Sequence, residues 1–311
     1  MQLSSPKKLN SFLLSSTLIS LVILYFVQEI PFVWQLSIFV LLMLATGIPH
    51  GAVDHIVFQH VEERSGKVKI SYIRFFLFYL GIIAGYALLW ILLPQFCLLV
   101  FLLMSFYHFG QSQLYYIRWE EKSIFKILLY VSWGCLIIGE IIFFNYEASA
   151  KVLEGIVVLP EMINPSEIKF IILVLGLLTL GILTVARLQH RLSSVQLAFE
   201  ICSIILLTAL FHLAPLLIAF AIYFGLWHSL KAIQAELIHF GQQCSMAWFY
   251  RKAWPFSALS FVGIGLLFLI AGQLEAYISY YMLFFIAISV LTMPHMYYMQ
   301  KLYQNPDKQE Q

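Results

Sequence analysis

Apolar segments of about 20 residues recur along almost the whole chain, and they restrict the possible fold more than any other feature. A helix that crosses a bilayer needs about 20 mostly apolar residues. Only helices and closed barrels can cross, because every backbone polar group must be satisfied within the lipid. We expect a single integral membrane domain over residues 1–311, an all-α polytopic bundle of about ten transmembrane helices. The candidate helices are 11–27, 31–50, 73–93, 95–116, 124–144, 168–187, 196–212, 215–236, 254–272 and 277–298.

The composition supports this class. Only 11% of the residues are charged and 61% are hydrophobic, whereas a soluble domain has about 25% charged residues. The net charge of +2 gives no basis for a nucleic-acid partner. The N-terminal MQLSSPKKLN is similar to the start of a signal peptide, but no small-residue cleavage site follows, so we expect a retained first helix. The cysteines lack paired spacing and predict neither a disulfide frame nor a metal site: Cys97, Cys135, Cys202 and Cys244.

The positions of lysine and arginine predict the orientation of the helices. Cytoplasmic loops of membrane proteins carry an excess of both residues. If the N-terminus lies in the cytoplasm, every lysine and arginine except Lys151 and Lys169 falls on the cytoplasmic side. We therefore expect a multi-pass protein of the inner (cytoplasmic) cell membrane with both termini inside.

The stretch GIPHGAVDH, residues 47–55, interrupts the second apolar segment. Its proline removes a backbone donor and its two glycines permit backbone shapes that other residues resist. Histidine and aspartate are costly at membrane depth and are therefore functional candidates. From this stretch alone, two interpretations are open. The helix breaks where His50 and Asp54 face a protein cavity, or it simply ends with polar residues in the membrane interface.

Nine histidines occur in the chain, and the topology sorts them. Four lie inside apolar segments, on the second, fourth, eighth and tenth predicted helices, each in the half nearer the cytoplasm: His50, His108, His228 and His295. A lone histidine is more often a hydrogen-bonded core residue than a ligand, but four at one depth favour a shared metal site. We interpret the others outside the GIPHGAVDH stretch as solvated, interfacial or turn residues: His60, His190, His212 and His239.

Imidazole ligands suit iron, copper, zinc and nickel. Four neutral imidazoles leave the charge of a divalent ion uncompensated, so a nearby carboxylate that orients a ring nitrogen would matter. Asp54 is the expected partner, because it lies one turn from His50 if the helix resumes after the glycine. His55 is an alternative ligand, but its place on the helix favours a supporting role.

Four stretches carry a family resemblance: GIPHGAVD (47–54), SFYHFGQS (105–112), YFGLWHSL (223–230) and TMPHMYYM (292–299). In content, order and separation they resemble the Brp/Blh family of membrane-bound β-carotene 15,15′-dioxygenases, which serve microbial rhodopsins. The resemblance implies that a lipid-soluble carotenoid, β-carotene, reacts with O2 to give two molecules of retinal. It also implies a single Fe2+ ion bound by His50, His108 and His228, and a retinal-binding rhodopsin as a partner.

The chain departs from the family at one position. Members often continue the third stretch as HSxRH, which places a second histidine four residues after the first, whereas here that residue is Ala232. His295, His55 or a water molecule would then complete the ligand set. A long, rigid hydrocarbon also requires a tunnel between helices, and the aromatic residues beside the key histidines are pocket candidates: Tyr107, Tyr223, Trp227, Tyr297 and Tyr298.

Two other functions are compatible with intramembrane histidines. A di-iron desaturase or hydroxylase would need about eight histidines in HxxxH and HxxHH clusters, which this chain lacks. A transporter or metal permease would place histidines along a path through the membrane, whereas these four share one depth. A structural partner for a rhodopsin, with an inactive site, is a further alternative because of Ala232.

Overall fold

The computed structural model describes residues 6–27, 29–64, 66, 71–120, 122–157, 164–241, 244–273 and 280–304. Helices make up its regular structure, and no strand occurs within these ranges. The elements are α1 Pro6–Phe26, α2 Phe32–Leu42, η1 Met43–Gly47, α3 Ile48–Gly51, α4 Asp54–Arg64, α5 Tyr72–Leu92, α6 Pro94–Leu114, α7 Ile124–Phe144, α8 Tyr146–Leu153, α9 Pro165–Leu188, α10 Ser194–Leu213, α11 Leu216–Ala221, η2 Ile222–His228, α12 Ser229–Phe240, α13 Met246–Gln273 and α14 Tyr280–Gln304. The segments η1 and η2 are π-helical.

Ten helical stretches in the described residues are long and apolar enough to cross a membrane, so the all-α multi-pass prediction is confirmed. Five boundaries were wrong by four residues or more. The first span begins at Pro6, the second continues to Arg64, the eighth to Phe240 and the tenth to Gln304, and the ninth begins at Met246. Most of these extensions contain charged or polar residues, so an apolar window did not detect them. The first residues of the predicted tenth helix, 277–279, lie outside the described residues.

Proline and cap residues set several helix ends. Pro94 and Pro165 occupy the first position of α6 and α9, where the missing backbone donor would have no partner in any case. Ser193 and Gln196 form a reciprocal capping box at the start of α10. The tight turn expected between the seventh and eighth spans is present, because α10 ends at Leu213 and α11 begins at Leu216.

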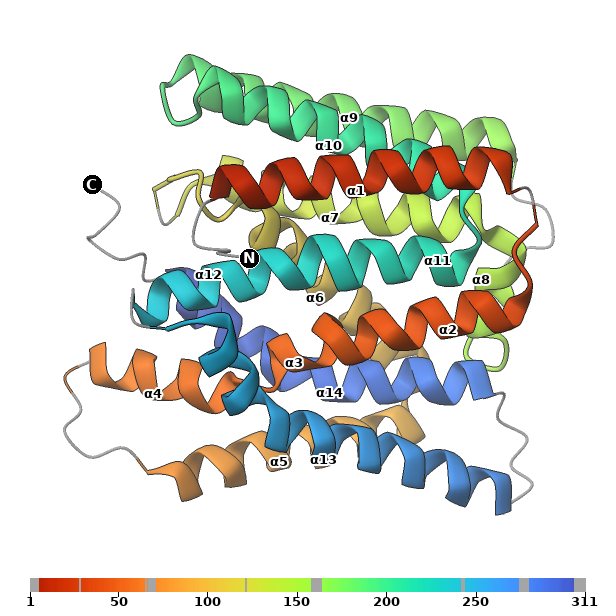
Figure 1. The fold of residues 1–311 in the computed structure, drawn as a ribbon, viewed down its shortest axis with the longest axis vertical. Helices are drawn as coiled ribbons and strands as arrows, with labels where there is room; N and C mark the ends of the chain where they lie inside the picture. The colour runs from red at the N-terminus through yellow and green to blue at the C-terminus, as the bar shows by residue number, and fades with distance from the viewer. Residues whose placement is uncertain are drawn as a thin grey trace.

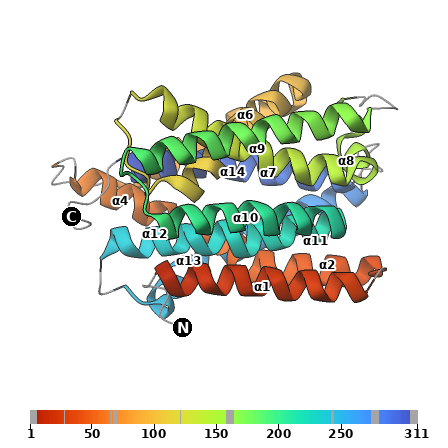
Figure 2. The same cartoon turned by 90° about the horizontal axis from the view of Figure 1, so that it is seen from above.

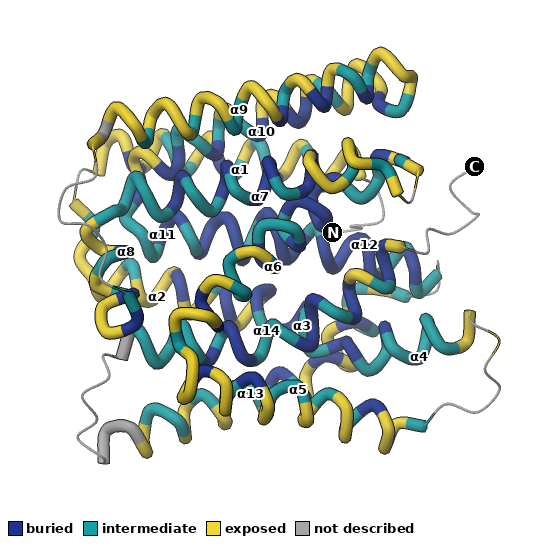
Figure 3. The backbone as a smooth tube through the Cα atoms, turned by 180° about the vertical axis from the view of Figure 1, so that it is seen from behind, coloured by how far each residue is buried: buried dark blue, intermediate teal, exposed yellow. Residues whose placement is uncertain are grey.

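The outer surface of the bundle is apolar, as a lipid-facing surface must be. Exposed residues lie on the outer faces of the peripheral helices and buried residues lie between helices (Figure 3). Large apolar side chains are widely exposed there, including Leu77, Ile91, Leu177 and Trp254. A soluble protein rarely exposes so much contiguous apolar surface, so the structure is that of a multi-pass membrane protein.

The spans run roughly parallel, with α9 and α10 at one edge and α5 and α13 at the other (Figure 1). Figure 2 shows the same bundle turned by 90°. The spans that contain α6, α11–α12 and α14 lie between these edges, and they include most of the buried polar residues of the site described below. Because α1 begins and α14 ends at the same end of the bundle, the number of crossings is even. The cytoplasmic placement of both termini stays a prediction.

The closest contact between two spans joins α6 and α7. A Cβ atom added to Gly110 would lie 1.9 Å from the carbonyl oxygen of Tyr130, and one added to Gly134 would lie 1.9 Å from that of Phe106. Only glycine permits backbones to approach this closely, which is a common way to pack helices in membranes. The contact fixes the part of α6 that carries His108.

Candidate metal centre

The second span changes its winding three times before it reaches the cytoplasmic end. After α2 it widens into the π-helical η1, returns to α-helix in the four-residue α3, turns at residues 52–53 and resumes as α4. Pro49 lies at the start of α3. The break predicted from GIPHGAVDH is therefore present, and His50 lies in the short α3 between the two irregular segments. Such π-helical segments often occur at functional sites.

The eighth span contains a matching irregularity. Its π-helical segment η2 ends at His228, and it packs against η1. The hydroxyl of Thr46 in η1 donates a 2.6 Å hydrogen bond to the carbonyl of Gly225 in η2. A Cβ on Gly225 would lie 2.8 Å from the Cβ of Leu42, so the backbones meet where only glycine fits. This contact holds the two widened helices in register and places His50 beside His228.

The structure brings the four intramembrane histidines together. The centre of the His50 ring lies 5.1 Å from that of His228 and 4.8 Å from that of His295. The His108 ring lies 5.2 Å from His228 and 5.6 Å from His295. None of the four is more than 5% exposed. Each ring comes from a different span, so the group joins α3, α6, η2 and α14, and we call it the histidine group.

Hydrogen bonds orient two of the rings. The Nδ1 of His50 contacts the carbonyl oxygen of Gly47, and the Nδ1 of His295 lies 2.8 Å from Oδ1 of Asp54. Because a carbonyl or carboxylate oxygen accepts, Nδ1 carries the proton in both rings and Nε2 keeps a lone pair. Both Nε2 atoms, and Nδ1 of His108, are buried and have no hydrogen-bond partner among the residues that the structure describes. Unpartnered buried nitrogens that carry lone pairs are the feature expected of metal ligands.

The ring spacing agrees with the dimensions of a four-imidazole metal site. A nitrogen binds a divalent metal at about 2.1 Å, so neighbouring ring centres lie roughly 4.6 Å apart at right angles and 5.3 Å apart at tetrahedral angles. The observed spacings run from 4.8 to 5.6 Å. The donor atoms of the described residues do not already form a group of three or more positioned to hold a metal. The rings are therefore at the right separation, but their nitrogens would have to turn toward a common point.

Asp54 has a different partner from the one expected. Its carboxylate contacts His295 on α14, and it also accepts a 2.9 Å hydrogen bond from the hydroxyl of Tyr79. The expected pairing with His50 required an unbroken helix, and the turn at residues 52–53 removes that relation. His55 lies apart from the histidine group, with its ring 4.5 Å from that of Phe256.

The remaining histidines lie elsewhere. His212 contacts the ring of Phe144 near the opposite end of its span, and His190 lies in a turn with positive φ. His60 packs against Phe240. His239 was expected to be solvated or interfacial, but it is buried, with Nδ1 2.7 Å from the carbonyl of Ala235. Its α12 helix extends beyond the predicted boundary, which explains this error.

An apolar cavity of 220 Å³ reaches all four rings of the histidine group. Phenylalanine, leucine and isoleucine side chains from α2, α6, α7, α11, η2 and α14 form most of its wall. None of its lining residues is exposed. Its few polar side chains other than the histidines are Ser105, Ser149, Tyr223 and Thr292. The histidine group therefore lies at the wall of a hydrocarbon-like space.

Two of the five pocket candidates line cavities. Tyr223 lines the apolar cavity and Tyr107 lines a smaller one beside His108. The other three line neither and serve packing instead. Trp227 donates a 2.8 Å hydrogen bond to Thr17, Tyr297 lies beneath the ammonium of Lys301, and Tyr298 stacks on Tyr79. Proximity in sequence to a histidine did not place them on the cavity side.

The sequence reasoning missed several buried polar residues. Glu200 on α10 accepts hydrogen bonds from Gln113 and Tyr116, and Lys231 lies 3.9 Å away. Glu236, two turns beyond His228 on α12, is fully buried, and neither carboxyl oxygen has a hydrogen-bond partner. Charged residues inside apolar spans are rare and are a recognisable signal. Gln111, one turn beyond His108, is also buried with its oxygen unpartnered.

The position that departs from the resembled family is part of the apolar core. Ala232 is almost completely buried, in a cluster that includes Val57, Phe75 and Tyr298. No metal-binding side chain is available there. The fourth ring of the histidine group comes from His295 on the last span.

Comparison with known proteins adds independent information. A family model for beta-carotene 15,15′-dioxygenase matches residues 41–303, which include all four rings of the histidine group. A curated beta-carotene 15,15′-dioxygenase from an uncultured marine bacterium, 66A03, is 26% identical over 259 residues, which cover 82% of this chain and 89% of the relative. No solved structure matches the chain. This chain belongs to the β-carotene 15,15′-dioxygenase family, whose members are carotenoid cleavage dioxygenases.

Proposed function

We propose that this protein cleaves the central double bond of β-carotene with O2 to give two molecules of retinal, with Fe2+ held by His50, His108, His228 and His295. One observation supports this most directly. Four imidazoles from four spans meet at the wall of an apolar cavity. The membership of the chain in a family of carotene-cleaving enzymes supports the substrate class.

The stoichiometry of the reaction fits the residues of the cavity. Both oxygen atoms of O2 enter the products, one in each aldehyde, so the reaction needs no net proton and no external reductant. The cavity accordingly needs no general acid or base. Apart from the four histidines, which are the proposed metal ligands, its described lining residues include no carboxylate, lysine or cysteine.

The protein would position the substrate, exclude water from the site and set the ligand field of the metal. Its apolar wall takes a hydrocarbon from the lipid and excludes water. Asp54 would hold the His295 ring with Nε2 toward the cavity, and the Gly47 carbonyl would do the same for His50. A ferrous ion bound by neutral imidazoles would supply open positions at which O2 and the alkene can react.

The charge distribution supports the cellular setting. With both termini in the cytoplasm, nearly all lysines and arginines face the cytoplasm, which is the usual pattern for a protein of the cytoplasmic membrane. We expect the retinal to be taken up by a retinal-binding rhodopsin in the same membrane. Purification with and without a co-expressed rhodopsin would test that partner.

Expression in a bacterium that makes β-carotene, followed by chromatography, tests the activity. The wild-type chain should convert the orange carotenoid into retinal and should contain one iron per chain after purification. Replacing His50, His108, His228 or His295 singly with alanine should abolish retinal formation and lower the iron content. Each replacement removes a ligand, whereas His212→Ala, which changes a histidine far from the group, should preserve both.

Four results would contradict this proposal or part of it. Full iron occupancy in His108→Ala would exclude a shared site for the four rings. Two irons per chain would favour a desaturase-type centre instead, and uptake of metal into sealed vesicles without any retinal would favour a permease. Full activity in His295→Ala would remove that ring from the ligand set.

A further inference from the structure

A second cavity of 230 Å³ adjoins His108 on the other side from the apolar cavity. We call it the amide pocket, because Gln111 of α6 and Gln300 of α14 line one end of it. The two cavities share only His108 and Met296 in their walls. Because an α-helix turns by roughly 100° per residue, Met104 and Gln111 lie to one side of His108 on α6 and Ser105 and Phe109 lie to the other. His108 is thus the partition between the two spaces.

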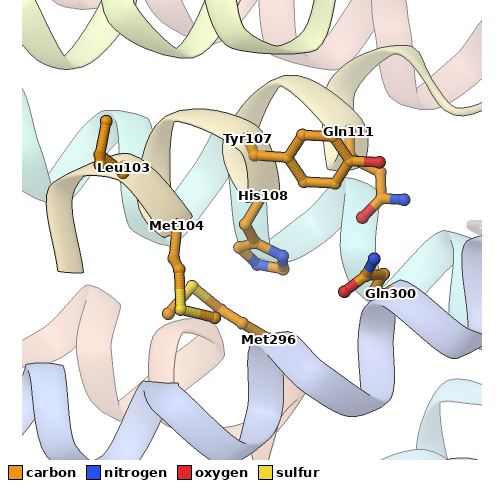
Figure 4. Close-up of a pocket in the computed structure, with 7 residues that line it drawn as sticks. All are labelled: Leu103, Met104, Tyr107, His108, Gln111, Met296 and Gln300. Carbon is orange, nitrogen blue, oxygen red and sulfur yellow. The ribbon is translucent and has the colours of Figure 1, made fainter. Parts of the chain in front are cut away.

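The amide pocket has one buried amide oxygen without a hydrogen-bond partner in the described part of the chain. Gln111 is only 1% exposed, and its Oε1 has no hydrogen-bond partner among the described residues. In Figure 4 the carboxamides of Gln111 and Gln300 face each other at one end of the pocket. The thioethers of Met104 and Met296 lie together at the other end, with the His108 ring between the two ends. An unsatisfied buried polar atom costs about 1–3 kcal/mol. Oε1 accepts, so a hydroxyl group would satisfy it directly, whereas a carbonyl oxygen would be bound by the Nε2 groups of the two carboxamides, which donate.

The amide pocket opens outward. Leu103 and Gln300 on its wall are exposed, so the pocket reaches the outside of the bundle between α6 and α14. Its inner wall consists of Met104, Met296 and His108. Methionine side chains are flexible and adapt to irregular shapes, so this wall can yield to a ligand that passes between the cavities.

The side-chain carboxamides lie where they could bind the oxygenated product but not the hydrocarbon substrate. Gln111 lies three residues beyond His108, about 4.5 Å further along the axis of α6. A hydrocarbon polyene has no atom that can form a hydrogen bond with a carboxamide. Once its central bond is broken beside the histidine group, each half carries an oxygen within a short distance of Gln111. A carboxamide offers both donors and an acceptor, so it can bind a carbonyl or a hydroxyl oxygen.

We propose that the amide pocket is a binding site for the oxygen-bearing end of a polyene aldehyde, so that the cleaved product, but not the hydrocarbon substrate, is held by Gln111 and Gln300 on its way out between α6 and α14. This inference rests on the proposed carotene cleavage for the origin of its ligand. The binding site itself does not depend on the metal or on turnover.

Direct binding to the full-length protein in lipid nanodiscs tests the site. Quenching of tryptophan fluorescence should be titrated with three ligands of equal length: retinal, retinol and the hydrocarbon that has a methyl group in place of the aldehyde. The wild-type protein should bind the two oxygenated ligands roughly 3- to 10-fold more tightly than the hydrocarbon, as expected for one net hydrogen bond. Gln111→Met and Gln300→Met should remove that preference and leave hydrocarbon binding unchanged.

Gln35→Met is the matched control, because it makes the same chemical change on α2, where Gln35 bonds the carbonyl of Ile30 instead of lining either cavity. Equal binding of all three ligands by the wild-type protein would overturn the proposal. A preference that persists in both Gln111→Met and Gln300→Met would do the same. Gln300 is exposed, so its variant remains informative if Gln111→Met does not fold.

The result also separates this proposal from the proposed function. Preferential retinal binding by a protein that forms no retinal in cells would refute the proposed cleavage and leave the site intact. Retinal formation by a protein that binds the three ligands equally would refute the site alone.

Discussion

The glycine contact between α6 and α7 makes a quantitative prediction. In Gly134→Ala the new Cβ would lie 1.9 Å from the carbonyl oxygen of Phe106, although Cβ atoms essentially never approach other atoms closer than 3.0 Å. The two helices would therefore have to separate by at least about 1.1 Å at this point, and backbone shifts of this kind cost about 1–3 kcal/mol. Phe106 lies two residues before His108, so the same movement would displace that ring.

Gly139→Ala is the matched control on the same helix. Its added Cβ would find only the ring of Phe143, at 3.9 Å, which is an ordinary contact. Both substitutions gain the same helix propensity, about 0.5–1 kcal/mol, so the difference between them isolates the close approach. We expect Gly134→Ala to unfold at a temperature roughly 2–8 °C below that of Gly139→Ala.

Thermal unfolding in detergent, followed by intrinsic fluorescence, measures this difference, and metal content and retinal yield measure its effect at His108. The double variant Gly110→Ala/Gly134→Ala adds a second test. Because one separation of the helices relieves both clashes, its destabilisation should be smaller than the sum of the two single effects. Equal stability of Gly134→Ala and Gly139→Ala, or strict additivity in the double variant, would refute the packing described here.

Three further predictions follow from the histidine group and the topology. Asp54→Asn should keep the fold but lower metal affinity or activity by about 10- to 100-fold, because an amide orients the His295 ring less strongly than a carboxylate; a metal titration measures this, and an unchanged affinity would contradict the role of the pair. Thr46→Val should lower the free energy of unfolding by about 1 kcal/mol through loss of the hydrogen bond to Gly225, measured by thermal unfolding, with Ser37→Ala, on the exposed face of α2, as its neutral control. Reporter fusions after Pro94 and residue 160 should report the outside and fusions after Gly66 and Lys308 the inside, and an outside signal at Lys308 would contradict the even number of crossings.

Much of the fold was predictable because insertion into a bilayer depends mainly on one sequence property, hydropathy. Ten apolar stretches required ten crossings, and the structure contains them. The boundaries failed where a helix continues beyond the apolar stretch. The segment DHIVFQHVEER forms α4, but hydropathy measures transfer into lipid and carries no information about a helix that packs against other helices.

The proximity of the four histidines could be anticipated from their similar depth in the membrane. Their hydrogen-bond partners could not be anticipated from the sequence. The four histidines lie on even-numbered spans, which all run in the same direction. They share a depth when their distances from the helix ends agree, and this requires only the order of the chain. The pairing of Asp54 with His295 depends on a turn at residues 52–53 and on which face of α14 meets α4. The π-helical segments η1 and η2 also shift every later side chain around the helix axis. On α14, which is α-helical, Tyr297 and Tyr298 lie about 200° and 300° around the axis from His295, so they line neither cavity although they follow it closely in sequence.

The last ring of the histidine group has a consequence for biosynthesis. Asp54 and His295 are 241 residues apart, so at roughly 5–20 residues per second a ribosome needs about 12–48 s to make the second partner after the first. Throughout that interval Asp54 is in the chain without its imidazole partner. The histidine group becomes complete only when the tenth span inserts, so the four-imidazole metal site proposed above would have all its ligands only after that step.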